Sequence, residues 1–128
     1  MLLDTEVLIW AAESSPRLSE SARAIVVDPT NERLLSAAVS WEMAIKIGLG
    51  KLAVDGPLHV FLDAQTDLLS LIPLPIETRH SLTVLQLPQF TNHRDPFDRM
   101  LIAQAMTEGI PVVSADRRFA QYGVQVIW

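Results

Sequence analysis

Residues 95–116, DPFDRMLIAQAMTEGIPVVSAD, contain the start and end signals of a helix followed by a short apolar strand. Asp95 before Pro96 is typical of an N-cap and a first helical position, and Gly109 is typical of the residue that follows a helix. The segment therefore predicts a helix over residues 96–108 and a strand over 111–113, which ends shortly before Asp116.

The rest of the chain repeats this alternation of short apolar runs with segments of helical periodicity. We expect further strands over residues 2–3, 34–35, 69–74 and 124–127, and further helices over 5–12, 19–27, 39–49, 58–68 and 77–85. Strands that are apolar on both faces and alternate with helices predict an α/β fold, with a parallel sheet covered by helices on both sides. Right-handed crossovers place every strand-to-helix turn at one edge of such a sheet, where open α/β folds bind ligands.

The composition restricts the classes of function. The 128 residues carry 15 Asp and Glu against 10 Lys and Arg, a formal net charge of −5, and no Cys. The length predicts one domain over residues 1–128, and the absence of Cys excludes disulfides, zinc knuckles and thiolate nucleophiles. Asp4 interrupts the first apolar run, so we expect no signal peptide or membrane span, and a soluble cytoplasmic protein. The negative charge is not typical of nucleic-acid-binding proteins, so such a role would need a local site.

Four acidic residues follow predicted strands and lie near the starts of predicted helices. Asp4 and Asp116 come directly after strands, where an N-cap role explains each one taken singly. Glu42 follows the second strand and can pair with the lysine four residues later, a spacing that needs no function. Asp98 lies in the middle of the apolar stripe of its helix, which is unusual for a carboxylate, although a capping role with Asp95 is an equal alternative. Only the joint arrangement of these acids can therefore indicate a function.

The expected topology brings the four acids to the same edge of the sheet. Two unit charges ~4 Å apart repel by about 1 kcal/mol in water and about 4 kcal/mol at an effective dielectric constant of 20. Protonation of some members or a bound cation relieves such a cluster, and an all-oxygen site suits Mg²⁺ or Mn²⁺. A metal site of this kind supports hydrolysis of a phosphodiester by metal-activated water, without a side-chain nucleophile.

The remaining polar candidates are less specific. Four arginines lie beside the acids in sequence and are candidates for phosphate-backbone contacts, with solvated surface charge as an equal alternative for each: Arg94, Arg99, Arg117 and Arg118. Three histidines are scattered and do not indicate a zinc site: His59, His80 and His93. We expect His59 and His80 on the surfaces of helices.

Four segments together carry a family resemblance. They are LLDT at residues 2–5, SWEMAIK at 40–46, HRDPFDRMLIAQA at 93–105 and VVSADRRF at 112–119. With these segments and the order of its acids, the chain resembles the PIN-domain ribonucleases, and specifically the VapC-type toxins of toxin–antitoxin systems. The resemblance implies a Rossmann-like three-layer α/β/α sandwich with a central parallel sheet. It also implies an endoribonuclease that depends on Mg²⁺ or Mn²⁺, is inhibited by a cognate antitoxin and forms a homodimer.

The same resemblance assigns roles by position. Asp4, Glu42 and Asp98 match the three core metal-site acids, and Asp116 matches a fourth, more variable acid. The resemblance thus implies that all four are metal ligands and catalytic residues. Three neighbours would support the site: the hydroxyl residues Thr5 and Ser114, and the additional acid Asp95. Four apolar residues lie on helices that meet the antitoxin in similar toxins, with core packing as the alternative: Ile9, Trp10, Ile45 and Leu49.

Two other functions fit parts of the pattern. An Asp after the first strand also occurs in phosphoacceptor domains and haloacid-dehalogenase-like phosphatases. However, DTE at residues 4–6 lacks the second Asp of the phosphatases, and no Lys follows a late strand as in receiver domains. A non-catalytic PIN-like module that only binds RNA or a protein partner remains an alternative. It predicts that metal binding is absent or purely structural.

Overall fold

The computed structural model describes residues 1–128 and contains five parallel strands, six α-helices and one 3-10 helix. The strands are β1 (Leu2–Leu3), β2 (Arg33–Ser36), β3 (Leu71–Leu74), β4 (Val112–Val113) and β5 (Val126–Ile127). The helices are α1 (Thr5–Ala12), α2 (Glu20–Val27), α3 (Ala37–Gly48), α4 (Leu58–Leu69), α5 (Thr78–Gln86) and α6 (Pro96–Glu108), followed by the 3-10 helix η1 (Arg117–Tyr122). The predicted alternation of strands and helices is confirmed.

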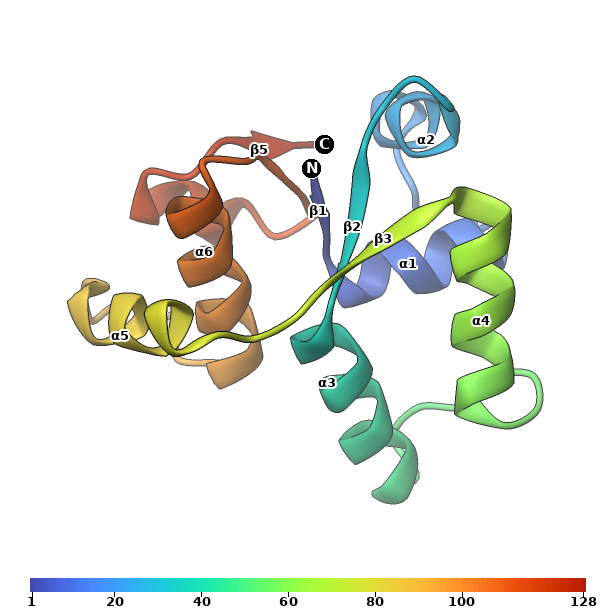
Figure 1. Cartoon of the computed structure of the whole chain (residues 1–128), viewed down its shortest axis with the longest axis horizontal. Helices are drawn as coiled ribbons and strands as arrows, with labels where there is room; N and C mark the ends of the chain where they lie inside the picture. Colours follow the sequence, from blue (N-terminus) through green and yellow to red (C-terminus); the bar gives the residue numbers. More distant parts are fainter.

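The strand order β3-β2-β1-β4-β5 places β1 in the centre of the sheet. The chain first adds β2 and β3 on one side of β1 and then adds β4 and β5 on the other side. Figure 1 shows α5 and α6 together on one side of β1, β2 and β3, and α1, α2 and α4 on the other. The predicted α/β/α arrangement around a central parallel sheet is thus confirmed. The change of direction between β1 and β4 creates a crevice at the carboxyl ends of these two strands.

The two central strands are the most deeply buried part of the sheet. Leu2 pairs with Val112 and Leu3 with Val113, and none of these four side chains is exposed to solvent. Ile102 of α6 is equally buried and belongs to the same hydrophobic core. Burial of each such side chain contributes about 1.5–3 kcal/mol. This packing fixes β1 relative to β4, and with them the residues that follow each strand.

Local signals explain most element boundaries. Asp95 caps α6 by accepting two backbone N–H groups of its first turn, and Gly109 ends that helix with φ 66°. The strand expected over residues 69–74 begins only at residue 71, because α4 continues for one more residue and ends at Ser70 with φ 48°. Serine rarely adopts this left-handed conformation, so the sequence gives no signal for it. No helix combines the length and the hydrophobicity that a membrane-spanning segment needs.

Candidate functional site

A polar cavity of about 180 Å³ lies where β1 and β4 end, at the edge predicted for a ligand site. Six acidic side chains, two cations and one hydroxyl line it, and no hydrophobic residue does. The lining consists of Asp4, Thr5, Glu6, Glu42, Lys46, Asp95, Asp98, Asp116 and Arg118. The structure therefore brings the four acids of the sequence analysis into one cavity, together with Thr5 and Asp95. Arg118 is the one arginine of the four candidates that reaches it.

Asp4 directly follows β1 and is held by bonds from two parts of the chain. Its Oδ1 accepts the backbone N–H of Thr5 at 2.6 Å, and its Oδ2 accepts the hydroxyl of Ser114 at 2.7 Å. Ser114 follows β4, so this hydrogen bond joins the ends of the two central strands. Burial raises the pKa of Asp4 to about 6, because desolvation outweighs the two hydrogen bonds to the carboxylate.

Glu42 is buried and lies in the second turn of α3, which begins at Ala37, two residues earlier than expected. Lys46 approaches its Oε1 at 2.6 Å, which is the predicted pair one helical turn apart. The hydroxyl of Thr5 donates to its Oε2. Both carboxylate oxygens are thus oriented by neighbours, yet each keeps a lone pair for a further ligand.

Asp98 lies in the first turn of α6 and faces the other acids. Its backbone N–H donates to the side chain of Asp95 at 3.1 Å, so Asp95 is the N-cap. The carboxylate of Asp98 does not complete a reciprocal capping box, because its Oδ2 lies 3.1 Å from Nε2 of His93. Burial, followed by repulsion from Asp4, Asp95, Glu42 and Asp116, raises the pKa of Asp98 to about 8. This carboxyl is therefore mostly protonated at neutral pH.

His93 and Asp116 complete this end of the cavity. Nε2 of His93 also lies 3.7 Å from Oδ2 of Asp116, and one ligand atom from each of His93, Asp98 and Asp116 lies within 4.8 Å of the other two. Arg118 bonds both carboxylate oxygens of Asp116 and thereby lowers the pKa of that carboxyl. Burial lowers the pKa of His93, which favours the neutral ring.

Sequence reasoning missed His93, because it lies in a loop without periodicity. The only indication in the sequence was that His93 begins residues 93–105, one of the four segments that carry the family resemblance.

Comparison with known proteins assigns this fold to a family. The sequence model of the PIN domain matches residues 1–125. The chain belongs to the PIN domain family. Similar solved structures are VapBC2 from Rickettsia felis bound to a DNA fragment from its promoter (14% identity, TM-score 0.71), DNA-bound VapBC from Salmonella typhimurium (20%, 0.68) and FitAcB from Neisseria gonorrhoeae (22%, 0.66). Each match covers 98% of this chain and, in the same order, 95%, 94% and 94% of the other. No curated protein matches the sequence of this chain.

Arg99 does not reach the cavity of this PIN domain, contrary to its candidacy for substrate contacts. Its guanidinium is buried and donates to the carbonyl of Pro88 at 2.8 Å and to the hydroxyl of Tyr122 at 3.2 Å. It therefore holds the loop before α6 in place.

The two histidines expected on helix surfaces differ in their burial. His80 is buried, with its Nε2 2.7 Å from Oε1 of Glu108, so its predicted surface position was wrong. His59 is exposed as expected.

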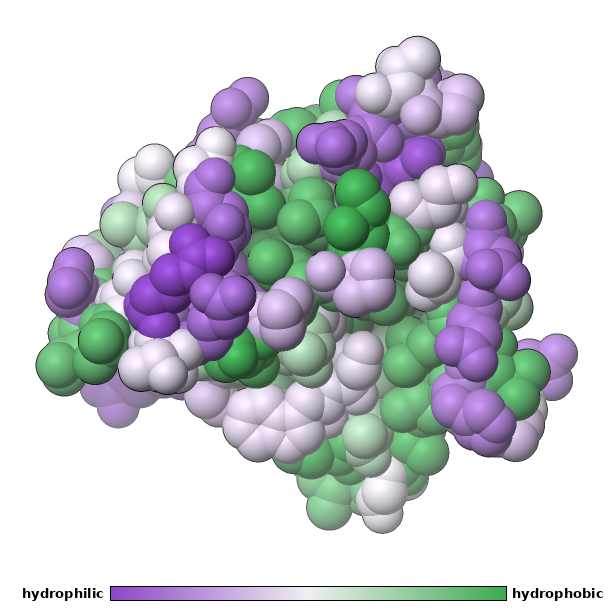
Figure 2. Space-filling view, viewed as in Figure 1, coloured by the Kyte–Doolittle hydropathy of each residue, from purple (hydrophilic) through white to green (hydrophobic).

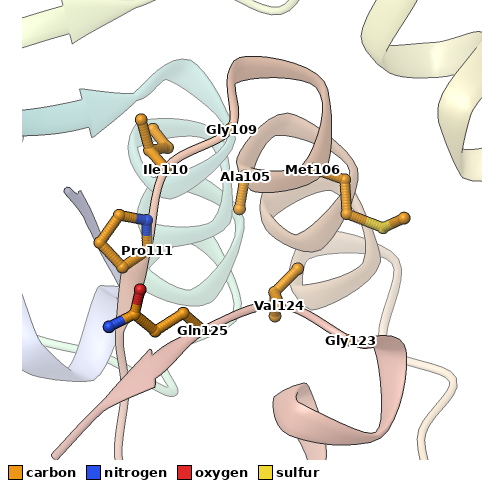
Figure 3. Close-up of a pocket in the computed structure, with 8 residues that line it drawn as sticks. All are labelled: Ala105, Met106, Gly109, Ile110, Pro111, Gly123, Val124 and Gln125. Carbon is orange, nitrogen blue, oxygen red and sulfur yellow. The ribbon is translucent and has the colours of Figure 1, made fainter.

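A second hollow of the PIN domain lies at the opposite end of α6. Figure 3 shows it between the end of that helix, the start of β4 and the segment before β5. Its lining has no titratable or nucleophilic side chain: Ala105, Met106, Gly109, Ile110, Pro111, Gly123, Val124 and Gln125. This hollow therefore offers no side chain for acid–base or nucleophilic chemistry.

Proposed function

We propose that this PIN domain is a metal-dependent endoribonuclease and the toxin of a toxin–antitoxin pair. The observation that carries the proposal is the position of Asp98. Its carboxyl is largely buried among four other acids, at the crevice where α/β sheets bind ligands. A folded protein gains nothing structural from such repulsion, whereas a divalent cation removes it.

The donor set of the cavity fits a divalent cation. Four carboxylates are available as oxygen ligands, which suits Mg²⁺ or Mn²⁺. Asp4, Glu42, Asp98 and Asp116 would hold the ion, which when bound would neutralise the phosphate and activate a water for attack. Ser114 and Thr5 would keep Asp4 and Glu42 in place by the hydrogen bonds described above.

The surroundings of the cavity suit a nucleic acid with unpaired bases. Trp41 precedes Glu42, is 54% exposed and meets the edge of Phe97 at a centroid distance of 4.9 Å. Bases of single-stranded RNA stack on such exposed rings. Arg94 and Arg117 are exposed as well and are candidates for contacts with the phosphate backbone.

A separate apolar surface suits the antitoxin. A hollow of about 490 Å³ lies between α1, α4 and residues 53–55, and Ile9 and Phe61 line it. Ile45 of α3 and Leu49, which directly follows that helix, are exposed. Figure 2 shows hydrophobic residues over the region where α3 and the following loop lie. Trp10 instead packs against Trp128, with the centroids of the two rings 5.8 Å apart. The neighbouring solved structures include VapBC and toxin–antitoxin complexes, which supports a partner protein for this surface.

Cleavage of total RNA by the purified protein tests the activity. The reaction is run in EDTA, in Mg²⁺ and in Mn²⁺, with Asp98→Asn as the inactive variant and Asp63→Asn, an exposed acid of α4, as the matched control. We expect discrete fragments that require metal, appear with Asp63→Asn and are absent with Asp98→Asn. If no metal supports cleavage and calorimetry detects no metal binding, the non-catalytic binding module becomes the better explanation.

A further inference from the structure

His93 occupies a buried and closely fixed position beside the acids. Its side chain is 1% exposed, and its ring lies between the rings of Phe119 and Tyr122, at centroid distances of 5.5 and 5.4 Å. Nδ1 lies 3.0 Å from the hydroxyl of Tyr122, while Nε2 is directed at Asp98 and Asp116. Nδ1 thus contacts the core residue Tyr122, whereas Nε2 faces the acidic cavity.

The hydrogen bonds of Tyr122 determine which nitrogen of His93 carries the proton. The Tyr122 hydroxyl has one hydrogen and lies 3.1 Å from the backbone carbonyl of His93, which can only accept. It also lies 3.2 Å from Nη1 of Arg99, which can only donate. The Tyr122 hydroxyl therefore donates its hydrogen to the carbonyl oxygen of His93, and Nδ1 of His93 donates its own hydrogen to the hydroxyl oxygen. In the neutral ring, Nε2 is then unprotonated.

In this tautomer Nε2 of His93 supplies no hydrogen to the two carboxyl groups that it faces, so the contact with Asp98 depends on a proton carried by Asp98 itself. The Nε2 lone pair lies 3.1 Å from a carboxylate oxygen of Asp98 and 3.7 Å from one of Asp116. A proton on this face can satisfy only one of these two contacts at a time, whereas a cation can bind all three ligand atoms. A histidine that binds a metal through one nitrogen commonly donates the hydrogen of its other nitrogen to a fixed acceptor, which is the arrangement seen here.

We propose that His93 is a metal ligand, and that its Nε2 binds the cation together with Asp98 and Asp116. The inference rests on the proposed metal site and adds a nitrogen ligand to a set that otherwise contains only oxygen. Imidazole favours transition metals, and Mn²⁺ accepts both ligand types, whereas Mg²⁺ prefers oxygen. The nitrogen therefore gives Mn²⁺ an advantage over Mg²⁺ in this cavity. Tyr122 acts as a positioning residue, because it fixes the tautomer that binds.

Pulsed electron paramagnetic resonance of the Mn²⁺-loaded full chain tests this directly. We expect modulation from a directly bound nitrogen in the wild type, its loss in His93→Gln and its retention in His59→Gln, the exposed matched control. Calorimetry should show that His93→Gln weakens Mn²⁺ binding by about tenfold or more, with a smaller change for Mg²⁺.

Two further measurements keep the inference refutable if His93→Gln does not fold. Wild-type protein with ¹⁵N-labelled histidine must show the altered nitrogen coupling, which requires no variant. Tyr122→Phe keeps the ring and should weaken Mn²⁺ binding by about 10- to 100-fold while the nitrogen coupling persists. Mn²⁺ binding without nitrogen coupling would overturn the role of His93 and leave the proposed function intact. Absence of binding for both metals would overturn both.

Discussion

Replacement of Asp98 by Asn should stabilise the metal-free protein. The unfolded carboxyl has a pKa of 3.8, whereas burial and the surrounding acids raise the pKa of folded Asp98 to about 8. Each pKa unit corresponds to about 1.4 kcal/mol, so at pH 7 the folded state loses about 4 kcal/mol relative to a neutral side chain of the same shape. A fifth of the side chain is exposed to water. We therefore expect Asp98→Asn to raise the free energy of unfolding by about 2–4 kcal/mol.

Urea unfolding in EDTA at several pH values measures this effect. The folded pKa values of Asp98 and Asp4 are both raised, so these two carboxyls bind more protons in the folded than in the unfolded chain between pH 4 and 8, while the lowered pKa of His93 opposes part of this effect just below pH 6.5. Wild-type stability should thus be highest near pH 4 and fall as the pH rises towards 8. The gain from Asp98→Asn should be largest at pH 8 and shrink towards pH 4. Asp63→Asn should change stability by less than about 0.5 kcal/mol at either end. A variant that is no more stable than the wild type at pH 7, or a gain that does not depend on pH, would refute the electrostatic account.

Three further predictions concern the metal, the fold and the substrate. Mg²⁺ or Mn²⁺ at one hundred times its Kd should stabilise the wild type at pH 7 by about 2.7 kcal/mol and thereby raise its Tm. The Tm of Asp98→Asn should rise far less, and equal thermal shifts of the two proteins would show that the ion binds elsewhere. Arg99→Lys should cost about 2–4 kcal/mol in urea unfolding, because lysine cannot replace the bonds of the guanidinium to Pro88 and Tyr122, and a neutral result would contradict its structural role. Trp41→Ala should weaken the binding of single-stranded RNA to Asp98→Asn protein by at least about fivefold in fluorescence anisotropy with no loss of Tm, and unchanged affinity would remove Trp41 from the substrate path.

The fold could be predicted from local chemistry because the residues that begin and end its helices are distinctive. Asp95 with Pro96 and Gly109 bound the longest helix, and apolar strands separated by helices leave few alternatives to a covered parallel sheet. The end of α4 at Ser70 could not be predicted, because a left-handed serine is imposed by the tertiary structure. The shift of the third strand follows from that one residue.

The site could be predicted only to the extent that topology determines it. Residues that directly follow β1 and β4, such as Asp4 and Asp116, reach the crevice because of where the strands end. Arg99 follows Asp98 in sequence, yet one step along a helix turns the side chain by 100°, from the cavity into the loop packing. His93 lies in a loop whose path depends on Arg99 and Tyr122, so only the folded chain reveals its direction.

The bond between Ser114 and Asp4 joins residues 110 positions apart and has a consequence for protein synthesis. A nascent chain that has not yet reached residue 112 has β1 without its partner β4, and lacks both Ser114 and Asp116. Asp4 is therefore translated 110 positions before the serine that holds its carboxylate, and the cavity cannot close around it in the meantime. The acidic cluster is therefore assembled only after residues 112–116 have been translated, and the proposed nuclease cannot become active before that point.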